Sequence, residues 1–209
     1  MKKLKILNLY AGIGGNRKLW VDEHEITAVE YKQEIADIYH DFFPDDKIVV
    51  GDAHEYLLEH YKEFDFIWSS PPCPSHSDIR RCGVHKGQYA ALYPEMSLYQ
   101  EIILLMNFAP KKIKWVIENV KPYYKPLIPP VQELHRHLFW SNFYIPPISL
   151  TDSRIHSQIS GSSEVYGIKL DKYKYKDKRK ILRNMVNPEL GEYILDYAMG
   201  NNKQKQLFK

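Results

Sequence analysis

The sequence is poor in cysteine: its 209 residues include only two, Cys73 and Cys82. Two cysteines cannot form a disulfide framework, and their spacing matches no zinc site. We therefore expect a reducing, cytoplasmic setting and no bound metal. A chain of this length suits a single domain, with a core large enough to be stable without metals or disulfides, and we expect a monomer.

The sequence also lacks long apolar runs and a strong net charge. No apolar stretch approaches the length of a membrane-spanning helix, so we expect no membrane partner. The formal net charge is +3, which permits nucleic-acid binding but is weaker than the strongly basic signature. Basic residues concentrate in 169–183, which reads KLDKYKYKDKRKILR. On charge alone, a solvated surface stretch is the simpler interpretation of this segment.

Short apolar segments alternate with segments of helical spacing, which predicts an α/β fold with a mostly parallel sheet and helices on both faces. Strands are expected at residues 4–9, 26–30, 47–50, 64–68, 115–120 and 137–143. Helices are expected at residues 32–43, 53–61, 97–108 and 188–197. In such folds, the loops after the carboxyl ends of the strands form the functional site.

A glycine-rich turn, LYAGIGG, follows the first expected strand. Such a turn lets backbone N–H groups approach a ligand, although a tight turn without a ligand is the simpler alternative. Glu30 ends the second strand, where a carboxylate can bind ribose hydroxyls, and Asp52 follows the third, where it can accept from an adenine amino group. Together they predict an adenosine site. No GK[ST] follows the glycines, which excludes a Walker-type phosphate loop.

Cys73 lies between prolines in SSPPCPSHS, directly after the fourth strand. A lone cysteine is usually a small buried hydrophobe, but prolines do not suit a core strand. The loop favours an exposed nucleophile, since a thiolate is the strongest protein nucleophile near neutral pH. His76 could serve as its base, as in a cysteine hydrolase. That reading leaves Glu30, Asp52 and the glycines unexplained.

Glu118 ends the apolar fifth strand in WVIENV. A carboxyl group there suits a general acid, and a structural carboxylate is the alternative.

These motifs resemble those of the DNA cytosine-5 methyltransferases, and most of all those of the compact phage and bacterial members. LYAGIGG looks like the family's first motif, PPC like its catalytic motif and ENV like its sixth, in the family's order. The resemblance covers about residues 4–143. It implies a Rossmann-like class I S-adenosylmethionine-dependent methyltransferase fold with a small C-terminal target-recognition region. It also implies a domain of residues 1–143, a recognition region of 144–182, and a C-terminal helix in 183–209 that completes the domain.

The resemblance implies that Cys73 adds to C6 of a flipped cytosine, so that C5 can attack the methyl group of S-adenosylmethionine. Glu118 would contact the cytosine ring, Pro72 would position the base, and Arg136 would approach its O2. The residues expected to bind the cofactor are Tyr10, Ala11, Gly12, Ile13, Gly14, Gly15, Glu30, Tyr31, Asp52, Ala53, Pro72 and Asn201.

The expected partner is double-stranded DNA. The residues expected to contact it are Pro72, Ser77, Arg80, Arg81, Lys86, Asn119 and His137. Residues 76–93 would form a lid that closes over the flipped base, although an ordinary surface loop is the alternative.

Two segments depart from or only partly match the family pattern. The eighth motif normally carries two arginines one residue apart, whereas here LHRHLFW places His135 and His137 there, with Arg136 between them. Gly200-Asn201 matches the GN pair of the last motif. An RNA (transfer RNA) cytosine-5 methyltransferase and a catalytically weak regulatory relative therefore remain alternatives.

We predict a short or relaxed target sequence, because the recognition region of 144–182 is much shorter than the separate target-reading domain of larger relatives. Bisulfite sequencing of DNA treated with the protein and S-adenosylmethionine measures this directly. Methylation confined to one long, strictly defined site would contradict the prediction.

Overall fold

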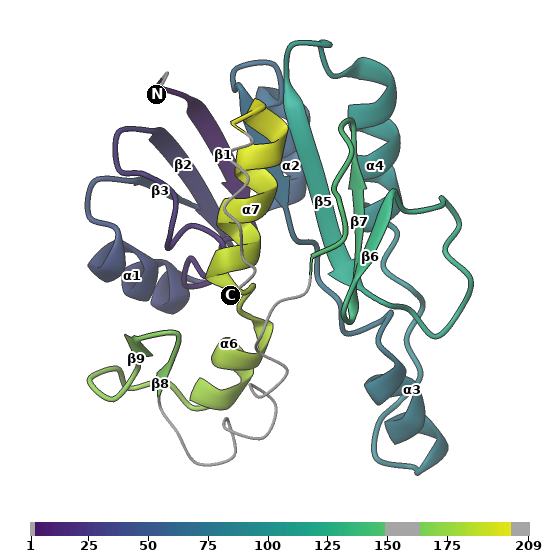
Figure 1. Ribbon diagram of the computed structural model, residues 1–209. Coiled ribbons are helices and arrows are strands. Elements are labelled where there is room, and N and C mark those ends of the chain that lie inside the picture. The colour runs from purple at the N-terminus through teal and green to yellow at the C-terminus, as the bar shows by residue number, and fades with distance from the viewer. Residues whose placement is uncertain (1–2, 149–163, 202–209) are drawn as a thin grey trace.

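The computed structural model describes residues 3–148 and 164–201, and in them a seven-stranded sheet forms the centre of the molecule (Figure 1). Its strands are β1 (Lys5–Leu9), β2 (Glu25–Glu30), β3 (Lys47–Val50), β4 (Phe66–Ser69), β5 (Lys114–Val120), β6 (Gln132–Leu134) and β7 (His137–Ser141). They lie in the order β3-β2-β1-β4-β5-β7-β6. Strands β1 to β5 pair in parallel, whereas β7 is antiparallel to β5 and β6.

The helices are α1 (Gln33–Phe42), α2 (Ala53–His60), α3 (Asp78–His85), α4 (Ser97–Phe108), α6 (Lys178–Asn184) and α7 (Pro188–Met199). A hairpin of β8 (Glu164–Val165) and β9 (Ile168–Lys169) precedes α6.

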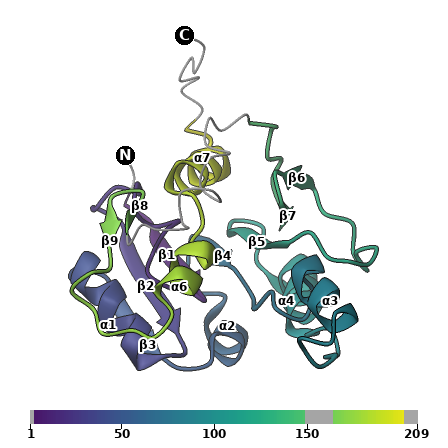
Figure 2. The same cartoon turned by 90° about the horizontal axis from the view of Figure 1, so that it is seen from below.

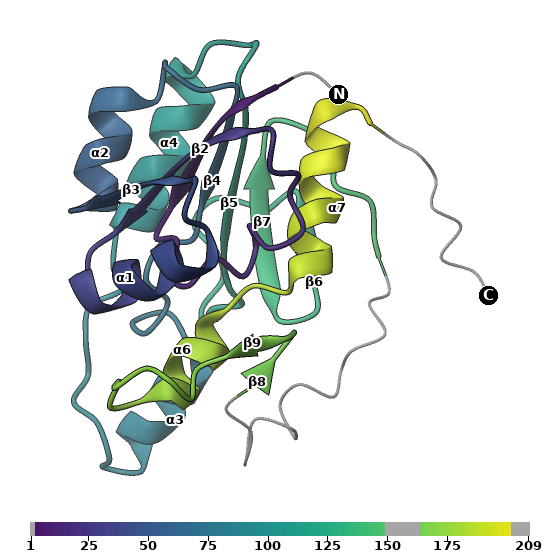
Figure 3. The same ribbon diagram turned by 90° about the vertical axis from the view of Figure 1, so that its left-hand side faces the viewer.

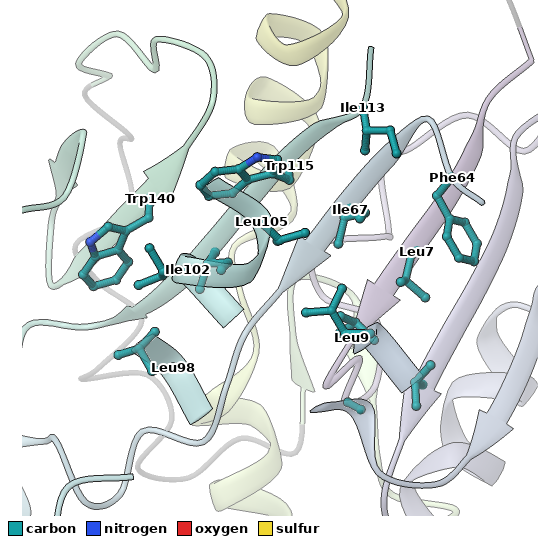
Figure 4. Close-up of a cluster of buried hydrophobic side chains, with 14 of the residues drawn as sticks. Leu7, Leu9, Phe64, Ile67, Leu98, Ile102, Leu105, Ile113, Trp115 and Trp140 are labelled. Atoms are coloured by element: carbon teal, nitrogen blue, oxygen red, sulfur yellow. The ribbon is translucent and has the colours of Figure 1, made fainter. Parts of the chain in front are cut away.

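Apolar layers cover both faces of the sheet, because the central parallel strands are apolar on both faces. On one face, Leu7 and Ile67 pack with Ile102 of α4 (Figure 4). On the other face, Ile6 packs in a cluster with Ile194 of α7. Figure 3 shows α2 and α4 on one side of the sheet and α7 on the other. These layers fix the sheet and therefore the loops that leave it.

Strands β1 to β5 all end at one edge of the sheet, which we call the carboxyl edge. Helices α3 and α6 and the β8–β9 hairpin lie beyond it in Figure 1, and Figure 2 shows α6 and α3 on its two sides. Helix α7 begins near this edge and runs back along the sheet. Asn187 caps its start by accepting from the N–H groups of Glu189 and Leu190, and Pro188 occupies the first turn.

The α/β fold with a mostly parallel sheet and helices on both faces is confirmed. Every strand and helix predicted from the sequence is present, with ends displaced by at most two residues. Helix α3, strand β6, the β8–β9 hairpin and α6 were not predicted. Helix α6 is short and largely basic, and its buried Ile181 and Leu182 pack in a cluster with Leu170 and with Ile13, which is distant in sequence.

The domain boundaries at residues 143 and 182 stay a prediction, and residues 149–163 of the expected recognition region lie outside the described part. No helix in that described part is both long and apolar enough to cross a membrane. Within residues 3–148 and 164–201, no group of three or more histidine, cysteine or acidic side chains is arranged to hold a metal ion.

A buried ion pair fixes the segment after the glycine turn to the loop before β3. Arg17 donates from Nε and Nη2 to the carboxylate of Asp46 at 2.9 and 3.2 Å, and Tyr39 donates its hydroxyl to the same carboxylate at 2.7 Å. All three side chains are buried.

We predict that Asp46→Asn lowers the free energy of unfolding by about 3 kcal/mol, because it removes the buried counter-ion of Arg17 and leaves the guanidinium paired with the exposed Asp22 at 3.1 Å. Asp45→Asn at the exposed neighbouring position should change it by no more than about 0.5 kcal/mol. Urea denaturation of both variants measures the difference, and equal losses in the two would contradict the role of the pair.

Candidate active site

The glycine turn after β1 combines strained and open backbone positions. Tyr10, Gly12 and Gly14 have φ angles of 55°, 56° and 79°, in the left-handed region that favours glycine. A Cβ atom at Gly14 would overlap the ring of Phe43, and one at Gly15 would overlap Met185. A Cβ atom at Gly12 would meet nothing within 4 Å. Gly14 and Gly15 therefore permit close packing, while Gly12 leaves open space in which a ligand can approach the backbone.

Two carboxylates flank this turn. Glu30 at the end of β2 accepts from the backbone N–H of Gly12 at 3.0 Å and from that of Lys32 at 3.1 Å. Asp52 caps α2 by accepting from the N–H groups of His54 and Glu55 at 2.8 and 3.2 Å. The N–H of Gly51 bonds the carbonyl of Glu30 at 3.1 Å, so the two acidic positions are neighbours. An open glycine beside two acceptors fits the adenosine part of a cofactor.

The remaining expected cofactor residues lie around the same turn. Ala11 and Ile13 are buried within it, and the Ala11 N–H bonds the Val29 carbonyl at 3.0 Å. Tyr31 is 74% exposed beside Glu30, and Ala53 is the first residue of α2.

Asn201 does not join this group. It lines a cavity with Leu4, Asp65 and Lys114, which lie at the starts of the parallel strands. The cause is the direction of α7, which runs away from the carboxyl edge and therefore carries Gly200-Asn201 to the opposite edge. The start of α7 is what approaches the glycine turn, since a Cβ atom at Gly191 would overlap the backbone of Asn16. The structure therefore does not bring Asn201 to the glycine turn.

The loop after β4 carries Cys73 and is tied to β5. Asn119 donates its side-chain amide to the carbonyl of Pro71 at 2.9 Å. The Cys73 carbonyl accepts from the N–H groups of His76 and Ser77 at 3.0 and 3.1 Å, which closes a turn behind the cysteine. Cys73 is a free, half-buried thiol, and the neighbouring Pro72 is exposed. The loop therefore holds the thiol in a fixed position at the carboxyl edge.

Burial is the main cause that raises the pKa of the Cys73 thiol, and the negative charge of Glu118 raises it further. The charges of Arg136 and Lys180 act in the opposite direction. Glu118 is itself buried, and its carboxylate lies 3.4 Å from Nε2 of His137. Cys73, Glu118, Arg136 and His137 are thus close enough to influence one another, although they come from three separate segments.

His76 is not the base of Cys73. Its ring is fully buried, Nδ1 lies 2.6 Å from the hydroxyl of Tyr124, and Nε2 has no hydrogen-bond partner. Burial also lowers the pKa of His76. The structure therefore gives no support to a cysteine hydrolase.

The expected DNA-contacting residues of the lid lie on or beside α3. Ser77 caps α3, and Lys86 follows its last residue. The Arg80 guanidinium lies over the ring of Tyr89 at 5.4 Å, and Arg81 forms an ion pair with Asp78 at 2.7 Å. The segment expected to form the lid thus contains one short helix, α3, which carries both arginines.

The hairpin formed by β6 and β7 carries the two histidines of the LHRHLFW segment. His135 is exposed with a φ of 54°, and His137 faces Glu118. Arg136 is exposed and donates from Nη2 to the carbonyl of Arg183 at 3.0 Å, so it joins this hairpin to the end of α6.

Glu101 is a residue of this region that the sequence analysis missed. It lies on α4 with no exposed surface, and it accepts hydrogen bonds from Tyr10, Ser69 and His54. The signal was available: Glu101 stands between Leu98 and Ile102 on the inward side of an amphipathic helix, where a charged residue requires partners.

Comparison with known proteins places these observations in a family. The sequence profile of the C-5 cytosine-specific DNA methylases matches residues 4–126. No curated protein sequence matches the chain.

Solved structures with a similar arrangement include a SAM-dependent methyltransferase from Agrobacterium tumefaciens, at 13% identity and a TM-score of 0.44 over 59% of this chain and 40% of that one. A putative methyltransferase, yhhF, from Escherichia coli has 13% identity and a TM-score of 0.43, and the match covers 66% of this chain and 74% of that one. A DNMT2 mutant from Spodoptera frugiperda has 24% identity and a TM-score of 0.38, and the match covers 56% of this chain and 35% of that one. The chain thus spans less than half the length of the first and third of these proteins.

We predict that Glu118→Gln raises the rate at which iodoacetamide alkylates Cys73 near neutral pH by a factor of about three, because removal of the negative charge lowers the thiol pKa and increases the thiolate fraction. Cys82 is exposed, so the measurement uses a Cys82→Ser background and mass spectrometry.

Glu133→Gln is the matched control, since Glu133 lies on β6 but pairs with Lys121 at 2.8 Å. This control should alkylate at the parent rate. A Glu118→Gln rate at or below that of the control would show that the Glu118 charge does not act on Cys73.

Proposed function

Because this chain belongs to the C-5 cytosine-specific DNA methylase family, we propose that it methylates C5 of cytosine in double-stranded DNA, with Cys73 as the nucleophile. The observation that carries the proposal is the position of Cys73 at the carboxyl edge, beside the buried Glu118 near the end of the adjacent strand β5. Its cofactor is S-adenosylmethionine, which supplies an electrophilic methyl group when bound.

The glycine turn and its two carboxylates are the proposed cofactor site. The backbone of residues 10–15 approaches the cofactor at Gly12, where space is open. Glu30 accepts from the ribose hydroxyls with the lone pairs that its two backbone bonds leave free. Asp52 and Ala53 lie at the start of α2, where the Asp52 carboxylate can accept from the adenine amino group. Tyr31, exposed beside them, can cover the adenine ring.

Cys73 and Glu118 supply the covalent chemistry. The Cys73 thiol gives its proton to solvent, and the thiolate Sγ forms a bond to C6 of the cytosine, which makes C5 nucleophilic. C5 then attacks the methyl group of S-adenosylmethionine, with S-adenosylhomocysteine as the leaving group. Loss of the C5 proton to water and cleavage of the Sγ–C6 bond restore the aromatic ring and free Cys73. Glu118 in its protonated form donates to N3 and accepts from the exocyclic amine, so that its proton neutralises the negative charge that N3 gains as the thiolate adds.

The raised pKa of Cys73 has a consequence for this mechanism. In the absence of a substrate, burial and the Glu118 charge keep the thiol protonated. A cytosine whose N3 binds the protonated Glu118 carboxyl removes that negative charge, and so favours the thiolate only when the base is in place. Arg136, whose positive charge already acts on Cys73, is the proposed partner for the cytosine O2.

Double-stranded DNA is the proposed partner, and the lid and the basic segment 169–183 are its proposed contact surfaces. Arg80, Arg81 and Lys86 lie in or next to α3, at the same edge as Cys73. The target base has to leave the duplex to reach Cys73, which is half-buried. The family is that of DNA methylases, and this supports DNA over RNA.

We predict that incubation with S-adenosylmethionine and unmethylated duplex DNA yields 5-methyldeoxycytidine, detected by mass spectrometry of the digested nucleosides. Cys73→Ala should abolish the product, because the C5 position is not nucleophilic without addition at C6. Cys82→Ala, at the exposed second cysteine, should retain it.

Transfer RNA forms the second arm of the same experiment. Methylcytidine in RNA alone would assign the substrate to RNA while keeping Cys73 as the nucleophile. Cofactor binding without product in either arm would favour a regulatory relative, and the substituted His135 and His137 would then be the first positions to restore to arginine.

A further inference from the structure

The carboxylate of Glu101 joins three segments that approach the carboxyl edge. Oε1 accepts from the Tyr10 hydroxyl at 2.6 Å and lies 3.1 Å from Nδ1 of His54. Oε2 accepts from the Ser69 hydroxyl at 2.6 Å. Tyr10 belongs to the glycine turn, His54 to the first turn of α2 and Ser69 to the end of β4. Glu101 itself comes from α4 and has no exposed surface.

Each of the three donors lies within four positions of a residue of the proposed site. Tyr10 precedes Gly12 by two positions, His54 follows Asp52 by two, and Ser69 precedes Cys73 by four. A buried carboxylate is costly unless it is paired and hydrogen-bonded, so the bonds between Glu101 and these donors are strong constraints on the three segments.

Tyr10 gives a direct reason to expect an effect on the cofactor site. Its φ of 55° is unfavourable for a residue with a side chain, and such a conformation persists only when the surroundings hold it. The bond from its hydroxyl to Glu101 is the anchor that holds it. Burial and the charge of Glu101 keep the pKa of the Tyr10 hydroxyl well above its usual range, so the group remains a hydrogen-bond donor.

We propose that Glu101 is a positioning residue that couples the cofactor turn to the loop carrying Cys73. The coupling runs from Tyr10 through the Glu101 carboxylate to Ser69. The inference rests on the proposed function, since it takes these two segments as the cofactor site and the nucleophile loop.

His54 provides a spectroscopic signature of this arrangement. The hydrogen bond to Glu101 raises the pKa of His54 and outweighs the opposing effect of burial. The charges of Glu101, Asp52 and Glu95 also raise it. We therefore expect loss of the Glu101 charge to lower the pKa of His54. A substitution that loosens the fold but keeps this charge is not expected to produce the shift.

The test uses the full chain in a Cys82→Ser background with three substitutions: Glu101→Gln, Tyr10→Phe and Ser69→Ala. Calorimetry measures the affinity for S-adenosylhomocysteine, iodoacetamide measures the accessibility of Cys73, and NMR titration measures the pKa of His54. Glu63→Gln is the matched control, because Glu63 forms an exposed pair with His60 at 2.8 Å at the far end of α2.

Glu101→Gln should weaken S-adenosylhomocysteine binding about tenfold, which is the expected effect of losing a hydrogen bond to a charged group. It should also change the rate of Cys73 alkylation at least about twofold and lower the pKa of His54. Glu63→Gln should do none of these. Tyr10→Phe should alter Cys73 alkylation in the parent protein but not in the Glu101→Gln background, because the two substitutions break the same path.

Independent, additive effects of Tyr10→Phe and Glu101→Gln on Cys73 alkylation would overturn the coupling, as would parent-like affinity and alkylation in Glu101→Gln. If Glu101→Gln does not fold, Tyr10→Phe, Ser69→Ala and the double variant supply the same test. Non-additive effects on the rate of Cys73 alkylation would support the coupling, and additive effects would overturn it. None of these readouts uses methyl transfer. A protein that methylates nothing would therefore refute the proposed function while the alkylation measurements still decide the role of Glu101.

Discussion

The parallel register of the central strands is the constraint on which the candidate site depends. Leu9 of β1 pairs with Val29 of β2 and with Ser69 of β4, and Ser69 pairs with Ile117 of β5. The residues one position further along each strand therefore line up across the sheet. In order they are Glu30, Tyr10, Ser70 and Glu118. Hydrogen bonding between backbones thus brings together four segments that are far apart in sequence, before any side chain contributes.

The pattern of apolar residues was sufficient to predict the five parallel strands, β7 and most helices, because burial on both faces imposes continuous apolar runs. It was also sufficient to place Cys73, Glu30 and Glu118 at one edge, since the ends of parallel strands coincide. It could not predict α6, whose Ile181 and Leu182 acquire their helical role only by contact with Ile13 and Leu170. It could not place Asn201 relative to the glycine turn, because a local GN pair contains no information about the direction in which α7 crosses the sheet.

Hydrogen bonds between buried polar groups fix positions that the apolar layers leave undetermined. The paired amides of Asn8 and Asn16, which lie 2.8 Å apart at their closest, join β1 to the segment after the glycine turn. Glu101 performs a similar task beneath Tyr10 and Ser69. Apolar contacts fix the distance between layers but tolerate sliding, whereas hydrogen bonds between buried groups fix individual atoms. The loops at the carboxyl edge are held by bonds of the second kind.

All four tryptophans of the chain, Trp20, Trp68, Trp115 and Trp140, are buried, with at most 3% of their surface exposed. Their fluorescence consequently comes from buried indole rings. A red shift of this fluorescence, caused by exposure of the rings to water, therefore reports unfolding of the sheet itself. Trp68 has a second property: its indole N–H donates to the Ser70 hydroxyl at 2.9 Å, in the segment that leads to Cys73. The molecule therefore contains an intrinsic optical probe whose hydrogen bond ends three residues from the proposed nucleophile.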